Sequence, residues 1–111
     1  MARASLQHFE LQVLLAVLRL GEQAYSVSIV ADLERRSERS VAPAAVFIAL
    51  RRLEAKGLVR SRLDDRNVPD TGRVRRYVKA TRLGIKAVRE AHDSHARLWR
   101  GLERVLRSER S

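Results

Sequence analysis

Residues 42–59 constrain the fold of this chain more than any other part of its sequence. Pro43 suits the first turn of a helix, where its missing N–H costs nothing. Apolar residues then recur at spacings of four and three, which predicts a helix with one buried stripe. The stripe consists of Val46, Leu50 and Leu53. Gly57 follows as a C-terminal cap, so the helix is predicted to end there and a new element to begin at once.

An arginine-rich hairpin is predicted directly after this helix. Residues 58–63 alternate apolar and basic side chains, as a strand with one wet face does. Residues 64–72 contain Asp, Asn, Pro and Gly and predict a loop, and residues 73–80 return as the second strand. The cations of the two strands are Arg60, Arg62, Arg73, Arg75, Arg76 and Lys79.

Three further helices complete the predicted order. Residues 6–20 are apolar on nearly every side and end at Gly21. Such a helix needs cover on two sides, one from its own core and one from a partner, for which a second copy of the chain is the simplest supplier. Ser26 is expected to cap a helix that runs to about Ser37, and Thr81 to open a long helix to about Leu106. The inward face of the helix after Ser26 is expected to consist of Val27, Val30 and Leu33.

This order of elements predicts a mainly α fold, a winged helix-turn-helix with a long C-terminal helix. Residues 5–80 are expected to form the winged DNA-binding domain and residues 81–107 the dimerisation helix. A chain of 111 residues is one compact domain at most, and a monomer of this size is only marginally stable, which favours a dimer. The sequence has no membrane-spanning apolar run, no signal-peptide pattern and no cysteine, and it is therefore expected to be cytoplasmic.

The net charge of +10 is concentrated in one part of the chain. Residues 1–50 carry 5 basic and 5 acidic side chains, residues 51–86 carry 12 and 4, and residues 87–111 carry 6 and 4. The excess therefore lies on the Pro43 helix, the hairpin and the start of the last helix. Phosphate binding is the commonest reason for such a concentration. The alternative is a solvated face in an arginine-rich proteome, because Arg outnumbers Lys 20 to 3.

The face of the Pro43 helix opposite its buried stripe is the candidate surface for reading DNA. It presents Ala44, Phe47, Ile48 and Arg51. Small residues at a helix N-terminus let the backbone approach a groove closely. Arg51 could pair with guanine or phosphate, and Ile48 could touch a thymine methyl group. The alternative is that Phe47 and Ile48 simply pack against the preceding helix.

The hairpin supplies candidate contacts to phosphates or to the minor groove. These are Arg60, Arg73, Arg75, Arg76 and Lys79. Contacts of this kind position a protein on DNA but read little sequence. Because side chains alternate along a strand, Arg75 and Arg76 cannot share a face, so one of them is expected to point toward the core or to anchor locally.

The last helix carries residues at heptad spacing, and such a seam implies a partner helix. The seam consists of Val88, His92, His95, Trp99, Leu102 and Leu106. Together with the apolar first helix it predicts a homodimer. The interface residues expected on the first helix are Leu6, Phe9, Leu11, Leu14 and Leu18.

The two histidines of the seam admit three interpretations. They are polar residues hydrogen-bonded across a dimer, metal ligands, or groups that make the interface sensitive to pH. Only Asp93 and His8 are available as further ligands, so no metal site is predicted. Trp99 beside His92 and His95 could also stack a flat aromatic effector, which makes these three residues a candidate effector pocket.

No pattern in the sequence indicates catalysis or a cofactor. It has no phosphate loop, no nucleophile–base pair and no carboxylate pair, so the chain is not expected to be an enzyme. RNA binding is disfavoured because few aromatic side chains are available to stack bases. The predicted partner is double-stranded DNA. The alternative function is a winged-helix module that binds protein and has lost specific DNA binding.

The residues also resemble the PadR family of bacterial transcriptional regulators, in length its short-tailed members. The resemblance runs from about Leu11 to Leu102. The segments that carry it are 13–18 with Gly21 and Tyr25, 45–47 with Leu50, 52–54, 56–59, 72–77 and 81–84. Each segment alone is moderately specific, because other winged-helix families share the leucine-rich third helix and the wing. Their joint order and spacing is much more specific.

The resemblance implies a homodimer in which the last helix packs against the first helix of its mate. It also implies binding to palindromic operators, usually as a repressor that an aromatic or drug-like effector releases. Phe47 matches the position of the family's usual Tyr and lacks its hydroxyl, so a phosphate hydrogen bond is lost there. Ser26 replaces a common Gly, Val78 a second aromatic residue and Ala80 a common Leu.

Overall fold

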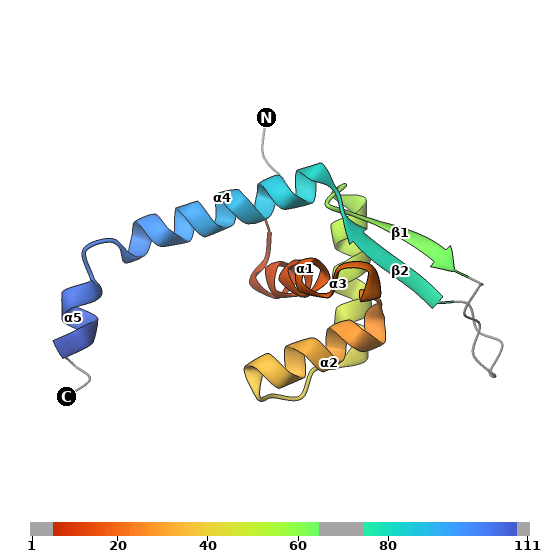
Figure 1. The fold of residues 1–111 in the computed structure, drawn as a ribbon, viewed down its shortest axis with the longest axis horizontal. Helices are drawn as coiled ribbons and strands as arrows, with labels where there is room; N and C mark the ends of the chain where they lie inside the picture. Colours follow the sequence, from red (N-terminus) through yellow and green to blue (C-terminus); the bar gives the residue numbers. More distant parts are fainter. Residues whose placement is uncertain (1–5, 65–74, 109–111) are drawn as a thin grey trace.

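The computed structural model describes residues 6–64 and 75–108, in the predicted order of elements. The helices are α1 (His8–Leu20), α2 (Ser26–Ser37), α3 (Pro43–Ala55), α4 (Arg82–Trp99) and α5 (Glu103–Ser108), with a short 3-10 turn, η1 (Gly21–Gln23). The strands β1 (Val59–Asp64) and β2 (Arg75–Ala80) form an antiparallel hairpin beside the helices (Figure 1). The predicted mainly α winged helix-turn-helix is thereby confirmed. Arg73, a predicted DNA contact, lies outside the described residues.

The hydrophobic core lies where α1, α2, α3 and the root of the hairpin meet. Its largest fully buried side chains are Val13, Leu14, Val17, Ile29, Val46 and Leu53. The stripe expected on the Pro43 helix is largely confirmed, since Val46 and Leu53 are buried and Leu50 packs against them half-buried. Ala49 is buried as well. The opposite face of α3 is thereby turned outward.

The inward face expected for α2 is wrong at Val27, which is 64% exposed. At about 3.6 residues per turn, Val27 and Leu33 lie about 120° apart around a helix, so the two cannot share one face. The buried apolar residues are Ile29 and Leu33, with Val30 half-buried beside them. The α2 stripe is therefore rotated relative to the one expected.

The start of α2 also differs from the prediction. Tyr25, not Ser26, occupies the N-cap position, and Ser26 is the first residue of the helix. The hydroxyl of Ser28, three residues after the N-cap, accepts a hydrogen bond from the Tyr25 amide at 3.0 Å. A serine therefore does cap this helix, but it is Ser28 and not Ser26. Helix α1 likewise begins at His8, two residues later than expected.

The junction between the hairpin and α4 is held by Thr81. Its hydroxyl donates to the Gly57 carbonyl oxygen at 2.6 Å and accepts from the Gly84 amide at 3.1 Å. The Thr81 amide donates to the Leu58 carbonyl oxygen at 3.0 Å. Because Gly57 and Leu58 lie two and three residues after the end of α3, the start of α4 is fixed relative to the end of α3.

Gly84 is the position at which this junction tolerates no side chain. A Cβ atom there would lie 2.1 Å from the Leu58 carbonyl oxygen, so backbone would have to move to admit it. We expect Gly84→Ala to lower the free energy of unfolding by about 2 kcal/mol, measured by urea denaturation. Ser94→Ala, on the exposed part of α4, is the matched control and should change it by less than about 0.5 kcal/mol. Equal midpoints for the two variants would contradict the close approach.

The long C-terminal helix predicted to run from Thr81 to Leu106 is interrupted. Helix α4 ends at Trp99 and α5 begins at Glu103, and between them Gly101 has a φ of 91°. Glycine is the residue that most readily adopts this backbone region, which stops a helix. The heptad seam of the sequence is therefore interrupted: Val88, His92, His95 and Trp99 lie on α4, Leu102 lies between the helices and Leu106 lies on α5.

Residues 92–108, here called the arm, extend away from the body of the chain (Figure 1). Every one of them is exposed, whereas Ala87 and Val88 earlier on α4 pack half-buried against the core. The radius of gyration is 16.6 Å. A compact domain of this length is expected to have about 13 Å. The arm therefore lacks the packing that a helix normally receives within its own chain.

Candidate nucleic-acid interface

The outward face of α3 presents the four residues expected to read DNA. Ala44, Phe47, Ile48 and Arg51 are all exposed, with Phe47 at 52% and Ile48 at 49%. The alternative, that Phe47 and Ile48 are absorbed by packing against α2, does not account for this exposure. The Arg51 guanidinium carbon lies 5.7 Å from the centroid of the Phe47 ring, within the range of a cation–π contact.

Helix α3 is flanked by hollows on both sides. An open hollow of about 540 Å³ lies between α2 and α3 and is lined in part by Val27, Val30, Pro43 and Phe47. A second one, of about 460 Å³, lies between α3 and the hairpin and is lined by Phe47, Arg51, Glu54, Ala55 and Arg76. The exposed edge of α3 therefore projects as a ridge, the form that can enter a major groove about 12 Å wide.

The register of the hairpin decides which cations lie beside α3. Leu63 faces Arg76 across the strands, and Ser61 faces Val78. The Ser61 hydroxyl donates to Glu54 Oε2 on α3 at 2.9 Å, which marks this hairpin face as the one turned toward α3. Arg76 Nη1 donates to the Ser61 hydroxyl at 3.1 Å. Of the predicted hairpin contacts that the structure describes, Arg76 is the one beside the recognition face.

Arg75 lies on the opposite face of the hairpin and is held locally. Its guanidinium carbon lies 4.8 Å from the centroid of the Tyr25 ring, and its Nη1 donates to the Tyr77 hydroxyl at 3.4 Å. That hydrogen bond raises the pKa of Arg75, which therefore stays a cation. Tyr25 and Tyr77 are themselves paired, with ring centroids 5.5 Å apart. Arg75 thus matches the expected local anchor, at the start of β2.

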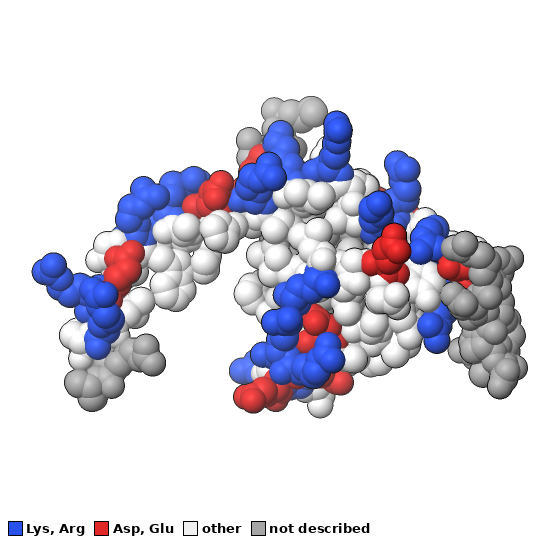
Figure 2. Space-filling view, in the orientation of Figure 1, with Lys and Arg blue, Asp and Glu red and all other residues white. Residues whose placement is uncertain are grey.

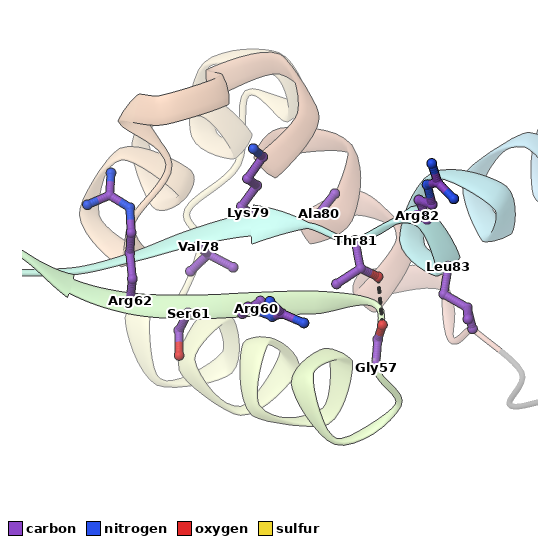
Figure 3. Close-up of a pocket in the computed structure, with 10 residues that line it drawn as sticks. All are labelled: Gly57, Arg60, Ser61, Arg62, Val78, Lys79, Ala80, Thr81, Arg82 and Leu83. Atoms are coloured by element: carbon purple, nitrogen blue, oxygen red, sulfur yellow. Dashed lines mark hydrogen bonds between the residues drawn. The ribbon is translucent and has the colours of Figure 1, made fainter.

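Arg60 and Lys79 also lie on the hairpin face turned away from α3. They are cross-strand partners, one residue pair from Val59 and Ala80 at the strand ends. They line an open hollow of about 600 Å³. Figure 3 shows them there together with Arg82 at the start of α4. The structure therefore divides the predicted DNA contacts between two faces and does not bring these two together with α3.

Two buried carboxylates brace the helices behind the interface. Asp32 of α2 is 3% exposed and accepts from Nε of Arg19 on α1 at 3.0 Å. This hydrogen bond, together with the nearby Arg36, lowers the pKa of Asp32. Glu10 of α1 is 2% exposed and accepts from Lys56 Nζ at 2.6 Å. Burial alone would raise the pKa of Glu10, but the Lys56 and Gln7 hydrogen bonds outweigh it and lower the pKa.

Sequence reasoning overlooked a cluster of cations at the end of α2. Arg35 and Arg36 share the Asp32 carboxylate, at 3.6 Å and 3.4 Å, and both remain largely exposed. Their separations from Asp32, three and four residues along a helix, were readable in the sequence. They lie just before the turn that leads into α3, where a helix-turn-helix meets the DNA backbone.

Several residues assigned to a dimer interface on α1 belong to the core of the single chain. Leu14 has no exposed surface, so it cannot contact a partner and its assignment is wrong. Leu6 and Phe9 pack half-buried against the same core. Leu11 is half-buried, and Leu18 is 38% exposed. The outer surface of α1 is therefore narrower than its sequence implies, because α2, α3 and the start of α4 cover most of it.

The arm carries exposed apolar side chains in close succession. Leu98 is 74% exposed, Trp99 49%, Leu102 46%, Val105 55% and Leu106 45%. His95 accepts a hydrogen bond at Nε2 from Trp99 Nε1 at 2.6 Å, and His92 pairs with Asp93 at 3.3 Å. Together, the exposed residues form a surface that a single chain leaves uncovered.

His92, His95 and Trp99, the candidate effector pocket, all lie on this exposed surface of the arm. In the single chain they line one side of a helix and do not enclose a cavity.

Within the described ranges, no three His, Cys, Asp or Glu side chains lie close enough together to hold a metal ion. Nor, in residues 6–64 and 75–108, is any helix both long and apolar enough to cross a membrane.

A match to the transcriptional regulator PadR-like family covers residues 14–90, most of the chain. The chain belongs to this family. A PadR family transcriptional regulator from Eggerthella lenta DSM 2243 has a similar structure, with a TM-score of 0.66 and 26% sequence identity over 88% of this chain and 87% of that one. A PadR-like transcriptional regulator from Bacillus cereus strain ATCC 14579 shares the fold, with a TM-score of 0.67 and 18% identity over 88% and 90%.

No curated protein matches the chain significantly. The family match and the related structures agree with the features of α3 and the hairpin described above. The protein is therefore a PadR-like, DNA-binding transcriptional regulator with a winged-helix fold.

Proposed function

We propose that this PadR-like protein is a homodimeric repressor that reads a palindromic operator with α3. The observation that carries the proposal is the exposure of Phe47, Ile48 and Arg51 on one ridge of α3. Exposed apolar residues beside a cation match the edge of a major groove, where thymine methyl groups and guanine acceptors lie side by side. Arg76, from the adjacent hairpin face, is positioned to contact the backbone.

The homodimer is supported by the arm. Five large apolar side chains at its end are exposed, and such a concentration of exposed apolar residues marks an interaction site. The partner we propose is a second copy, whose arm would lie across the outer surface of α1 near Leu11 and Leu18. In a two-fold dimer of this fold, the two copies of α3 would reach successive major grooves about 34 Å apart.

An effector would act through the arm. The His95–Trp99 pair presents an aromatic surface with a polar edge, which suits a flat aromatic molecule. We propose that such a molecule, bound where the two arms meet, changes the separation of the two α3 helices. Thr81 supplies the mechanical link, because its hydrogen bonds fix the start of α4 to the residues that follow α3.

Arg51→Ala tests the reading surface. We expect operator binding to weaken about 30-fold, because each of two half-sites loses a contact worth about 1 kcal/mol. The measurement is a mobility-shift titration on the region upstream of the protein's own gene, against random duplex. Arg97→Ala, which removes the same charge from the arm, is the matched control and should leave the affinity nearly unchanged.

The alternative, a winged-helix module that binds protein, makes a different prediction for the same titration. Wild type would show no preference for operator over random duplex, and Arg51→Ala would behave like Arg97→Ala. Either result with an intact dimer would overturn the proposed operator reading.

A further inference from the structure

The recognition surface leaves a group of cations on the other side of the hairpin unexplained. Figure 2 shows Lys and Arg side chains along the outer edge of α4 toward the hairpin. We call the following five residues the basic strip: Arg60, Lys79, Arg82, Lys86 and Arg89. All five are exposed. They are five of the 18 Lys and Arg residues that follow residue 50.

The strip is continuous across two elements. Arg60 and Lys79 are cross-strand partners, and they line one open hollow together with Arg82 (Figure 3). Lys86 and Arg89 follow Arg82 at four and seven residues along α4, so the three share one face of the helix. At about 1.5 Å per residue, the α4 part of the strip extends about 10 Å. The result is an extended row of cations.

The strip cations have no acidic partner of their own in residues 6–64 and 75–108. Other cations nearby do have partners, since Arg62 pairs with Asp64 and Lys56 with Glu10. On α4 the row ends at Asp93, which pairs with His92, and Glu90 lies along its edge, four residues after Lys86. Uncompensated charge in a row repels itself, and a linear polyanion relieves that repulsion.

The strip and the recognition face point in different directions. The Ser61–Glu54 hydrogen bond identifies the hairpin face that is turned toward α3, and Arg60 and Lys79 lie on the other face. A duplex held by Arg51 and Arg76 therefore lies on the far side of the hairpin from the strip.

We propose that the basic strip binds the sugar–phosphate backbone of a second DNA duplex, without regard to sequence, so that one protein bridges two DNA segments. An extended row of cations without aromatic side chains matches a regular line of phosphates, and a compact anion would fill only the hollow at one end. Five cations should give a salt dependence of the second binding event with a logarithmic slope of about −4.5. The inference goes beyond operator reading and does not require it.

A capture assay tests the proposal on the full-length protein. Protein bound to an immobilised duplex of its own upstream region is expected to retain a fluorescent duplex of unrelated sequence, and to release it as salt increases. The triple variant Arg82→Gln, Lys86→Gln and Arg89→Gln should retain at least 10-fold less of it and reduce the salt slope by about three. Its affinity for the immobilised duplex should stay within about 3-fold of wild type, since these cations do not lie beside α3.

The matched control removes the same charge from the arm, with Arg97→Gln, Arg100→Gln and Arg104→Gln, and should retain the second duplex as wild type does. Arg51→Ala should weaken binding to the immobilised operator but leave the amount of random duplex captured per bound protein at low salt unchanged, so failure of operator reading and failure of the strip are distinguishable. Equal capture by the strip variant and wild type would overturn the proposal. So would a parallel loss of operator affinity in the strip variant, or complete release of the second duplex by equimolar inorganic triphosphate.

Discussion

Leu98→Glu is expected to convert the proposed homodimer into folded monomers, with the dimer dissociation constant raised about 1,000-fold. Leu98 is 74% exposed in the single chain, so the substitution leaves the core intact. In a two-fold interface the residue occurs twice, and each copy would lose about 2 kcal/mol of apolar burial, before any cost of a buried carboxylate. Those two losses alone correspond to about 1,000-fold at 1.4 kcal/mol per factor of ten.

The measurement is sedimentation across a range of protein concentrations, with circular dichroism to verify the fold. Leu83→Glu is the matched control, because Leu83 is 59% exposed on the same helix but lies near the hairpin, away from the arm. That variant should dimerise as wild type does. A Leu98→Glu protein that remains dimeric would show that the arm is not the interface. A monomeric variant should also lose operator affinity, since one half-site supplies only part of the contacts.

The sequence was sufficient to predict α3, because its boundaries depend on local chemistry. Pro43 and Gly57 mark its two ends. Its apolar stripe is long enough to show which face of the helix is buried. Helix α2 was harder, since three apolar residues at constant spacings of three drift around a helix. The burial of Ile29 and exposure of Val27 follow from how α2 rotates against α1, which is a tertiary effect.

In the C-terminal region, two sequence signals gave opposite predictions. Heptad spacing from Val88 to Leu106 favoured a single helix, but Gly101 within it carried the opposing signal and determined the break. Leu14 was assigned to an interface because α1 is apolar nearly all round. Only the packing of α2, α3 and α4 around α1 could show which of its leucines remain at the surface.

The candidate site was predictable residue by residue but not as an arrangement. Strand alternation correctly separated Arg75 from Arg76, and the exposure of the α3 face agrees with its sequence. Which hairpin face meets α3 depends on register and on the Ser61–Glu54 hydrogen bond, and neither is encoded in a local pattern. The sequence therefore did not predict that the hairpin cations lie on two different surfaces.

Asp32→Asn is expected to lower the free energy of unfolding at pH 7 by about 3 kcal/mol. This value is at the lower end of the range for breaking a buried ion pair, because Arg19 is partly exposed. The carboxylate holds Arg19 of α1 and Arg36 of α2 together, and the amide cannot neutralise either cation. Arg19 and Arg36 hold the pKa of Asp32 in the folded chain below its ordinary value of 3.8. Its contribution is therefore complete well above pH 4 and is lost as pH falls through the folded pKa.

Urea denaturation at a series of pH values from 7 to 3 measures this contribution. The difference in stability between wild type and Asp32→Asn should be largest at neutral pH and should shrink steadily below about pH 4. Glu10 also has a lowered pKa, but it titrates in both proteins and cancels in the difference. Asp93→Asn, at an exposed pair with His92, should lose less than about 0.5 kcal/mol at every pH. The difference in stability between wild type and Asp32→Asn could instead stay constant with pH. That result would mean that Asp32 stabilises the fold by its shape and hydrogen bonding and not by its charge.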